Sequence, residues 1–89
     1  MQVVNLGFDN AVAVARIVVV ASATSAAMKR LRQEARKQGR LVDVTNGRRT
    51  RAIVITDSNH VVLSGLQAET LIQRIENING MREKLLRRK

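Results

Sequence analysis

The apolar positions at the start of the chain fall into two short runs that favour β-strands. Residues 3–6 and 16–21 are rich in valine, and residues 7–10 between them contain the Gly and Asn typical of a turn. Residues 11–15 alternate Ala and Val, so they can either begin the second strand or form a loop. Because the run at 16–21 is apolar on both of its faces, we expect a strand that is covered on both sides.

A first helix is predicted after this strand, ending near Gln38. Residues 22–25 offer several N-cap side chains, and Gly39 stands where a helix usually ends. The apolar positions of this helix recur every fourth residue, at Ala27, Leu31 and Ala35. Its polar face is strongly basic and consists of Lys29, Arg30, Arg32, Arg36 and Lys37.

The segment after this helix contains the strongest turn signal in the chain. Asn46-Gly47 lies between two β-branched runs, residues 41–45 and 48–55, and this dipeptide favours a type I′ turn with positive φ at both residues. We therefore predict an antiparallel hairpin that pairs Thr45 with Arg48, Val44 with Arg49, Asp43 with Thr50, and Val42 with Arg51. Since side chains alternate along a strand, Arg49 and Arg51 would face one side and Arg48 the other. Three guanidinium groups would then crowd one stiff tip.

The rest of the chain predicts a turn at 57–59, a strand at 60–63 and a second helix. Ser64 and Gln67 have the spacing of a capping box, and the apolar stripe that follows is Leu71, Ile75 and Ile78. Asn79-Gly80 marks a break in this helix. Beyond it, residues 81–89 form either an extension of the helix or a disordered basic tail.

The element order ββαβββα defines an α+β domain, with a small, mainly antiparallel sheet of about five strands and two helices. We assign residues 1–80 to a single domain and residues 81–89 to a basic C-terminal extension. Large apolar residues are few among the 89 residues, so the core is thin. Two helices on one face of the sheet would leave its other face wet, so we expect a homo-oligomer in which another subunit covers it.

Charge is the strongest compositional signal. Sixteen Lys and Arg residues against seven Asp and Glu residues give a net charge of +9. Residues 29–51 carry a net +7 and residues 82–89 a net +4, whereas the rest of the chain is net acidic. A merely solvated surface would intersperse acidic residues among the basic ones. Positive charge gathered in blocks is typical of proteins that bind nucleic acid or another anionic surface.

The chain offers little for catalysis, metal binding or export. It has no cysteine, and its one histidine, His60, follows a turn without evident metal partners. Neither a phosphate-binding glycine loop nor paired carboxylates can be picked out, so we expect neither an enzyme nor a cofactor. The apolar run at 11–27 has some likeness to a signal peptide, but no Lys or Arg precedes it and Arg16 interrupts it. We therefore expect a cytoplasmic protein.

The residue types favour double-stranded DNA over single-stranded RNA as the partner. Proteins that read single strands stack bases on aromatic side chains, whereas this chain has only Phe8, for which we expect a packing role. A duplex requires guanidinium and ammonium groups aimed at phosphates, and the planar fork of arginine binds phosphate or a guanine edge in a bidentate manner. Arg48 and Arg49 at the tip of the predicted hairpin are candidate DNA-binding residues. The predicted positions of Arg51 in the hairpin and of Lys29 and Arg30 in the first helix make these three further candidates.

A set of short motifs carries a resemblance to a known family. They are Asn5-Leu6-Gly7-Phe8, Arg16, Ser25-Ala26, Lys29-Arg30, Ala35-Arg36, the core Asp43-x-Thr45-x-Gly47-Arg48-Arg49-Thr50-Arg51-Ala52, Asp57-Ser58-x-His60 and Gln67-x-Glu69-Thr70. Together they span residues 3–75, and the Gly-Arg-Arg-Thr-Arg stretch is the most specific part. The chain resembles the RemA family of small bacterial DNA-binding regulators, named for the control of extracellular matrix genes.

This resemblance implies a transcription factor that assembles into a ring of identical subunits. As a regulator or a DNA-organising protein that binds duplex DNA, it would be nucleoid-associated. Many phosphate contacts around the rim would then grip a bent or wrapped duplex. The resemblance assigns DNA contact to Arg48 and Arg49 and importance to Arg16, for which a salt bridge to Asp9 or Asp57 at a subunit contact is an equal alternative. The sequence departs from the family where prolines are expected and alanines stand instead, at Ala23, Ala27 and Ala68. The loop before the first helix should therefore be less rigid.

Two other functions stay open from the sequence. The same arginines could bind structured RNA. Alternatively, the chain could be a self-assembling scaffold whose basic patch meets an acidic protein or a membrane surface. The membrane version is disfavoured because no basic amphipathic helix with bulky membrane-facing residues is evident.

Overall fold

The computed structural model describes the backbone of residues 1–87 and the side chains of residues 1–80. Its elements in chain order are β1 (Val3–Gly7), β2 (Asn10–Ala13), a 3-10 turn η1 (Val14–Arg16), β3 (Ile17–Ser22), α1 (Ala26–Lys37), β4 (Leu41–Asp43), β5 (Ala52–Thr56), β6 (Val61–Ser64) and α2 (Ala68–Arg87). The predicted α+β class with two helices is confirmed. The order contains one more strand than predicted, because the ambiguous segment after residue 10 pairs with β1 before it forms η1.

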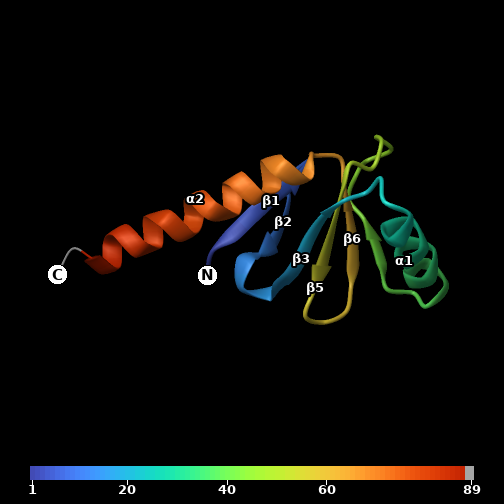
Figure 1. The fold of residues 1–89 in the computed structure, drawn as a ribbon, viewed down its shortest axis with the longest axis horizontal. Helices are drawn as coiled ribbons and strands as arrows, with labels where there is room; N and C mark the ends of the chain where they lie inside the picture. The colour runs from blue at the N-terminus through green and yellow to red at the C-terminus, as the bar shows by residue number, and fades with distance from the viewer. Residues whose placement is uncertain (88–89) are drawn as a thin grey trace.

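The strands form two sheets, whereas one sheet was expected from the sequence. β1 and β2 make a separate antiparallel ribbon, and the larger sheet has the order β3-β5-β6-β4 (Figure 1). Within the larger sheet β3, β5 and β6 are antiparallel neighbours, but β4 runs parallel to β6. The prediction of a mainly antiparallel arrangement therefore holds for every pair except this one.

The hairpin predicted around Asn46-Gly47 is half right. The turn has the expected geometry, since φ is 54° at Asn46 and 80° at Gly47, and the N–H of Arg48 donates to the carbonyl of Thr45 over 3.1 Å. The pairing of the two flanking runs is wrong, because β6 lies between β4 and β5. Residues 44–51 therefore cross the end of β6 instead of forming a strand beside β4, and the predicted pairs from Val44–Arg49 to Val42–Arg51 do not form.

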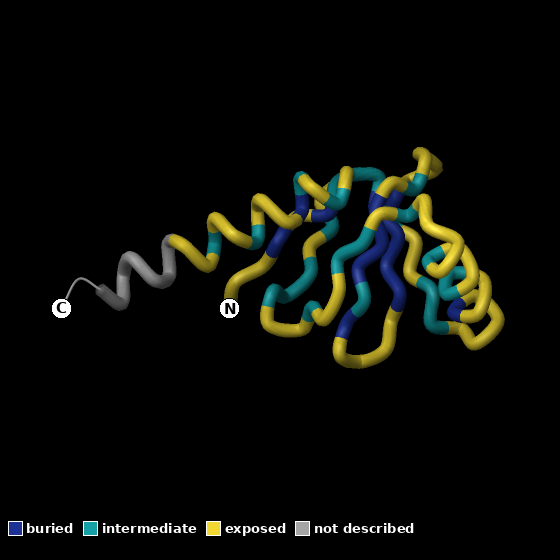
Figure 2. The backbone as a smooth tube through the Cα atoms, in the orientation of Figure 1, coloured by how far each residue is buried: buried dark blue, intermediate teal, exposed yellow. Residues whose placement is uncertain are grey.

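The larger sheet is covered on both faces, one helix to each face (Figure 2). On one face α1 packs over a cluster whose buried members are Ala35, Ile53, Val61 and Leu63. On the other face the β1–β2 ribbon and the first half of α2 enclose Val4, Leu6, Ala52, Val54, Val62 and Leu71. Successive residues of β5 and β6 alternate between the two clusters, as the pleat of a strand requires. The two-layer arrangement that would leave one face wet does not occur.

Two-sided burial belongs to β5 and β6 and not to β3, the strand for which it was predicted. β3 is an edge strand whose one neighbour in the sheet is β5. Val18 and Val19 in this strand are 64% and 38% exposed. Val19 lies opposite Ile55, on the face that carries α1. The single chain therefore leaves an apolar edge uncovered.

The helix boundaries follow local signals in α1 but not in α2. The Ser25 hydroxyl accepts the N–H of Met28 over 3.1 Å, and Gly39 follows the helix with a φ of 70°. At the start of α2 the predicted capping box does not form, because the first helical hydrogen bond runs from Leu71 to the carbonyl of Gln67. The predicted break at Asn79-Gly80 is also absent, since α2 continues to Arg87 and extends away from the body (Figure 1). The last two residues of the predicted tail, 88–89, lie outside the described residues.

Instead of capping α2, the fully buried Ser64 joins the two halves of the domain. Its hydroxyl donates to the carbonyl of Leu6 over 2.8 Å and accepts the N–H of Leu66 over 3.1 Å. These bonds connect β1 to the junction between β6 and α2. They fix the ribbon against the larger sheet.

Replacement of Ser64 by alanine should lower the free energy of unfolding by about 1–3 kcal/mol, because the Leu6 carbonyl loses its donor in a site closed to water. Urea unfolding at a fixed protein concentration measures this difference. Ser22→Ala is the matched control, since Ser22 is exposed, and it should change stability by less than about 0.5 kcal/mol. Equal effects of the two variants would contradict the role given to Ser64.

Candidate nucleic-acid interface

The segment 44–51, which we call the crossing loop, is held firmly at both of its ends. At its start the Asp43 carboxylate accepts the backbone N–H of Thr45 over 2.9 Å and the Thr45 hydroxyl over 2.6 Å. At its end the N–H of Arg51 donates to the carbonyl of Ser64, and the Arg51 carbonyl accepts the N–H of Ala23. The backbone that carries the three arginines is therefore anchored to three other segments of the domain.

A groove of about 530 Å³ separates the crossing loop from the first turns of α1. We call it the loop–helix groove. Four of its lining side chains are cationic, namely Lys29 and Arg32 from α1 and Arg48 and Arg49 from the loop. The remaining lining residues are Ala23, Thr24, Asp43, Thr45, Gly47 and Thr50. Four positive charges thus face one carboxylate, which leaves a strongly positive hollow at this end of the sheet.

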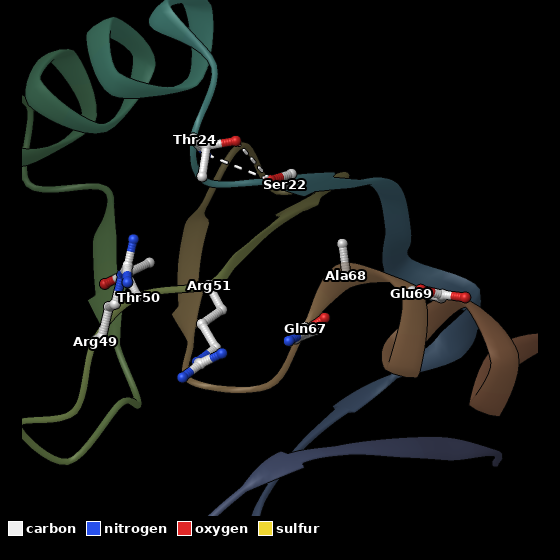
Figure 3. Close-up of a pocket in the computed structure, with 8 residues that line it drawn as sticks. All are labelled: Ser22, Thr24, Arg49, Thr50, Arg51, Gln67, Ala68 and Glu69. Atoms are coloured by element: carbon white, nitrogen blue, oxygen red, sulfur yellow. Dashed lines mark hydrogen bonds between the residues drawn. The ribbon is translucent and has the colours of Figure 1, made fainter.

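A second hollow of about 370 Å³ lies beside the crossing loop, next to the start of α2 (Figure 3). We call it the α2 pocket. Arg49 and Arg51 leave the loop on one side of it, and Glu69 stands across from them in the first turn of α2. Arg49 lines both hollows, so the loop–helix groove and the α2 pocket adjoin at this side chain.

The predicted site residues therefore do not all come together. Arg48, Arg49 and Lys29 share the loop–helix groove, and Arg51 lines the adjacent α2 pocket. Arg30 is exposed on α1 but does not line either hollow.

Arg16 lies at the opposite end of the larger sheet. It precedes Ile17, which pairs with Thr56, whereas Arg51 precedes Ala52, which pairs with Ser22 at the other end. Its Nε donates to Oδ1 of Asp57 over 2.7 Å, and its carbonyl accepts the N–H of Asp57 over 2.8 Å. This is one of the two ion pairs expected from the sequence, here formed within one chain. Both side chains are about half exposed, so the pair is worth at most about 1 kcal/mol.

Sequence reasoning missed two residues of this surface. Arg32 belongs to the basic face predicted for the first helix but is not among the predicted DNA-binding residues, although its three-residue separation from Lys29 places both on one side of α1. Phe8 was expected to pack, yet its side chain is 47% exposed and Cζ of Arg48 lies 5.2 Å from the centre of its ring. No local signal in the sequence indicates this contact, because the two residues are far apart along the chain.

Asp43 is the carboxylate that faces the cations of the groove. Hydrogen bonds from the hydroxyl and the N–H of Thr45 lower the pKa of this carboxyl below its usual value. The positive charges of Arg32 and Arg36 act in the same direction, and partial burial opposes them. Asp43 is therefore ionised at neutral pH, where it fixes the start of the loop and attracts Arg32.

The structure shows no sign of a metal site or a membrane span in the part that it describes. In the described residues there is no cluster of three or more potential metal ligands. The described helices also contain no stretch that is both long and apolar enough to cross a bilayer.

The fold and the site together define a small α+β domain that presents a cationic groove where a braced loop crosses the end of its sheet. A family model described as "RemA-like: Extracellular matrix regulatory protein A-like" matches residues 3–75. The chain therefore belongs to the RemA-like family, as its motifs indicated. The match includes the crossing loop and every cationic residue of the two hollows.

Relatives from several bacteria match more than four fifths of the chain. A protein of Thermodesulfovibrio yellowstonii is 52% identical over 92% of this chain and 96% of its own length. One from Oleidesulfovibrio alaskensis is 58% identical over 82% of this chain and 87% of its own length, and one from Geobacillus thermodenitrificans is 52% identical over 84% and 86%. All three carry the name "Putative regulatory protein".

The stability of the domain should depend on the Asp43 carboxylate in acid. Because its pKa is lower in the folded than in the unfolded chain, its contribution is complete above the unfolded value of about 3.9 and is lost as the pH falls through the folded pKa. Asp43→Asn keeps an oxygen acceptor but cannot titrate, so its unfolding free energy should fall less steeply below about pH 4 than that of the wild type.

Urea unfolding between neutral and acid pH measures this slope for both proteins. Thr45→Val removes the hydroxyl donor, the largest cause of the shift, and should also reduce the acid-dependent loss. A wild-type slope in Asp43→Asn would show that Asp43 does not carry the effect.

Proposed function

We propose that this protein is a regulator that binds double-stranded DNA as a homo-oligomer, through phosphate contacts made by the cationic side chains of the loop–helix groove. The observation that carries the proposal is the convergence of Lys29, Arg32, Arg48 and Arg49 on one hollow. The regulatory names of the relatives agree with it, and the RemA resemblance adds the expectation of DNA as the ligand.

The groove suits the sugar–phosphate backbone of nucleic acid. Two of its cations come from a helix and two from an anchored loop, so the charges are spread along a surface instead of gathered at one point. Thr24, directly before the Ser25 cap, also lines the groove, and the free N–H groups of a first helical turn favour a neighbouring anion. Arginine can in addition contact a guanine edge in a bidentate manner, which gives a route to sequence preference.

Each subunit offers only a few phosphate contacts, and repetition of the groove in an oligomer would multiply them. When several copies of a weak site engage one duplex, the later contacts are intramolecular, and the overall affinity exceeds that of one site by orders of magnitude. The ring implied by the RemA resemblance would achieve this. We further propose that the protein acts without catalysis or a cofactor.

Removal of the two loop arginines should weaken DNA binding and its dependence on salt. Log affinity against log salt has a slope of roughly −0.9 for each phosphate neutralised, so Arg48→Ala combined with Arg49→Ala should make the slope shallower by about 0.9 for each phosphate that these arginines neutralise. Fluorescence anisotropy with a labelled duplex across a range of salt concentrations measures the slope.

The matched control removes the same charge elsewhere, with Lys37→Ala at the end of α1 and Arg74→Ala on α2. This control should keep a slope closer to that of the wild type. If the salt slope becomes equally shallow in both double variants, the net charge of the protein and not the groove determines DNA binding. Competition between matched DNA and RNA duplexes distinguishes DNA binding from the alternative of structured-RNA binding. If no nucleic acid binds even at low salt, an acidic protein partner is favoured instead.

The exposed edge of β3 is the surface that we propose for self-association. An uncovered apolar edge strand offers both unpaired backbone groups and apolar side chains to a second copy. Val18, at 64% exposure, stands at an irregularity in the pairing of β3 with β5.

Val18→Asp should reduce the number of subunits in the native assembly, because it places a charge where apolar surfaces would meet. Native mass spectrometry with and without a short duplex measures the subunit number. Gln33→Asp, on the exposed surface of α1, is the control and should leave the assembly unchanged. An intact assembly in Val18→Asp would exclude this edge as the contact.

A further inference from the structure

We propose that Phe8 is a positioning residue that holds the guanidinium group of Arg48 at the rim of the loop–helix groove. This inference rests on the proposed function and deepens it, because it names the group that prepares one of the binding arginines. Phe8 is the only aromatic residue of the chain, and nearly half of its side chain faces solvent. Cζ of Arg48 lies 5.2 Å from the ring centre, within the range of about 6 Å in which a cation is attracted by an aromatic face.

The backbone at Phe8 is strained in a way that serves this contact. Gly7 pairs with Asn10, so Phe8 and Asp9 are the two central residues of a tight hairpin turn, with φ values of 53° and 62°. Asn and Gly are the residues that tolerate this conformation, and a bulky aromatic residue is disfavoured there. Strained residues persist where the surroundings fix them, and they cluster at functional sites.

Side chains of the ribbon fix this turn. Nδ2 of Asn10 donates to the carbonyls of Gly7 and Phe8 over 3.1 and 3.0 Å, and Oδ1 of Asn5 accepts the N–H of Gly7 over 2.7 Å. The Phe8 ring is therefore carried on a braced support and not on a free loop.

The ribbon turn meets the turn of the crossing loop. Phe8 and Asn10 line a hollow of about 230 Å³ together with Asp43, Val44 and Asn46, which places the two turns beside each other. Asn46 and Gly47 have positive φ as well, so each turn is a rigid two-residue reversal. The Phe8 ring and the Arg48 guanidinium group are thus each carried by a rigid turn, and the two turns lie side by side.

The contact prepares Arg48 for binding. A long arginine side chain loses rotamer freedom when it binds a phosphate, and a side chain already held in place loses less. Replacement of Phe8 should therefore weaken binding of DNA about two- to fivefold for each subunit, the range expected for an exposed cation–π contact.

The decisive variant is Phe8→Asn, which places a turn-compatible residue in the strained position. Its melting temperature should equal or exceed that of the wild type, while its affinity for a duplex falls by the stated factor. Phe8→Trp keeps an aromatic face and should bind within about twofold of the wild type. In a protein that already carries Arg48→Ala, Phe8→Asn should cause no further loss of DNA affinity, because Phe8 acts through the Arg48 side chain.

A second measurement on the protein without DNA separates this inference from the proposed function. NMR of protein labelled at arginine should show the Arg48 side-chain signals displaced by the ring current of Phe8, and the displacement should vanish in Phe8→Asn. If the Arg48 signals are displaced but no duplex binds, the proposed function is wrong, and so is the expected effect of Phe8 on DNA binding. The contact between Phe8 and Arg48 would still be confirmed.

Several results would overturn the inference itself. An undisplaced Arg48 signal would remove the contact. Equal loss of affinity from Phe8→Asn with and without Arg48 would mean that the ring touches DNA directly. A lowered melting temperature in Phe8→Asn would assign Phe8 a structural role.

Discussion

The central position of β6 is the constraint on which the rest of the molecule depends. All four of its residues are buried, so both of its faces need cover and both of its edges need partners. β4 and β5 take the two edges, and the chain between them must then cross the end of β6. The arginines of this segment are consequently displayed on an anchored loop above the sheet, where they meet the first turns of α1.

Local features of the chain could be predicted from the sequence, and long-range pairing could not. The dihedral angles at Asn46 and Gly47 depend on those two residues and were predicted correctly. Which strand pairs with β4 depends on a competition between β5 and β6. The short turn indicated pairing with the nearer segment, whereas β4 pairs with residues twenty positions further along the chain. The Ser25 cap was predictable for the same local reason. The capping box at Ser64 failed because α2 begins only at Ala68, so Ser64 lies before the cap position, where its hydroxyl donates to the Leu6 carbonyl and accepts the N–H of Leu66.

The candidate site shows the same division between local and tertiary information. The charged block at 29–51 indicated the correct region, but it is not one surface. Lys29 and Arg49 meet in the loop–helix groove, whereas Arg40, from the same block, donates to the carbonyl of Asn59 near the other end of the sheet. Arg16, equated with a family residue, pairs with Asp57 at that other end. Sequence identifies cations, and the fold decides which of them act together.

The separation of Arg16 from the arginines of the crossing loop gives the domain two unlike ends. At one end of the sheet four cations face a single carboxylate in the loop–helix groove, whereas at the other end Arg16 forms an ion pair with Asp57. Cyclic symmetry points every subunit the same way, so all cationic ends would line one side of such an assembly, whereas dihedral symmetry inverts half of the subunits and would display them on two sides. The point group therefore determines whether an assembly of this chain offers one anion-binding surface or two.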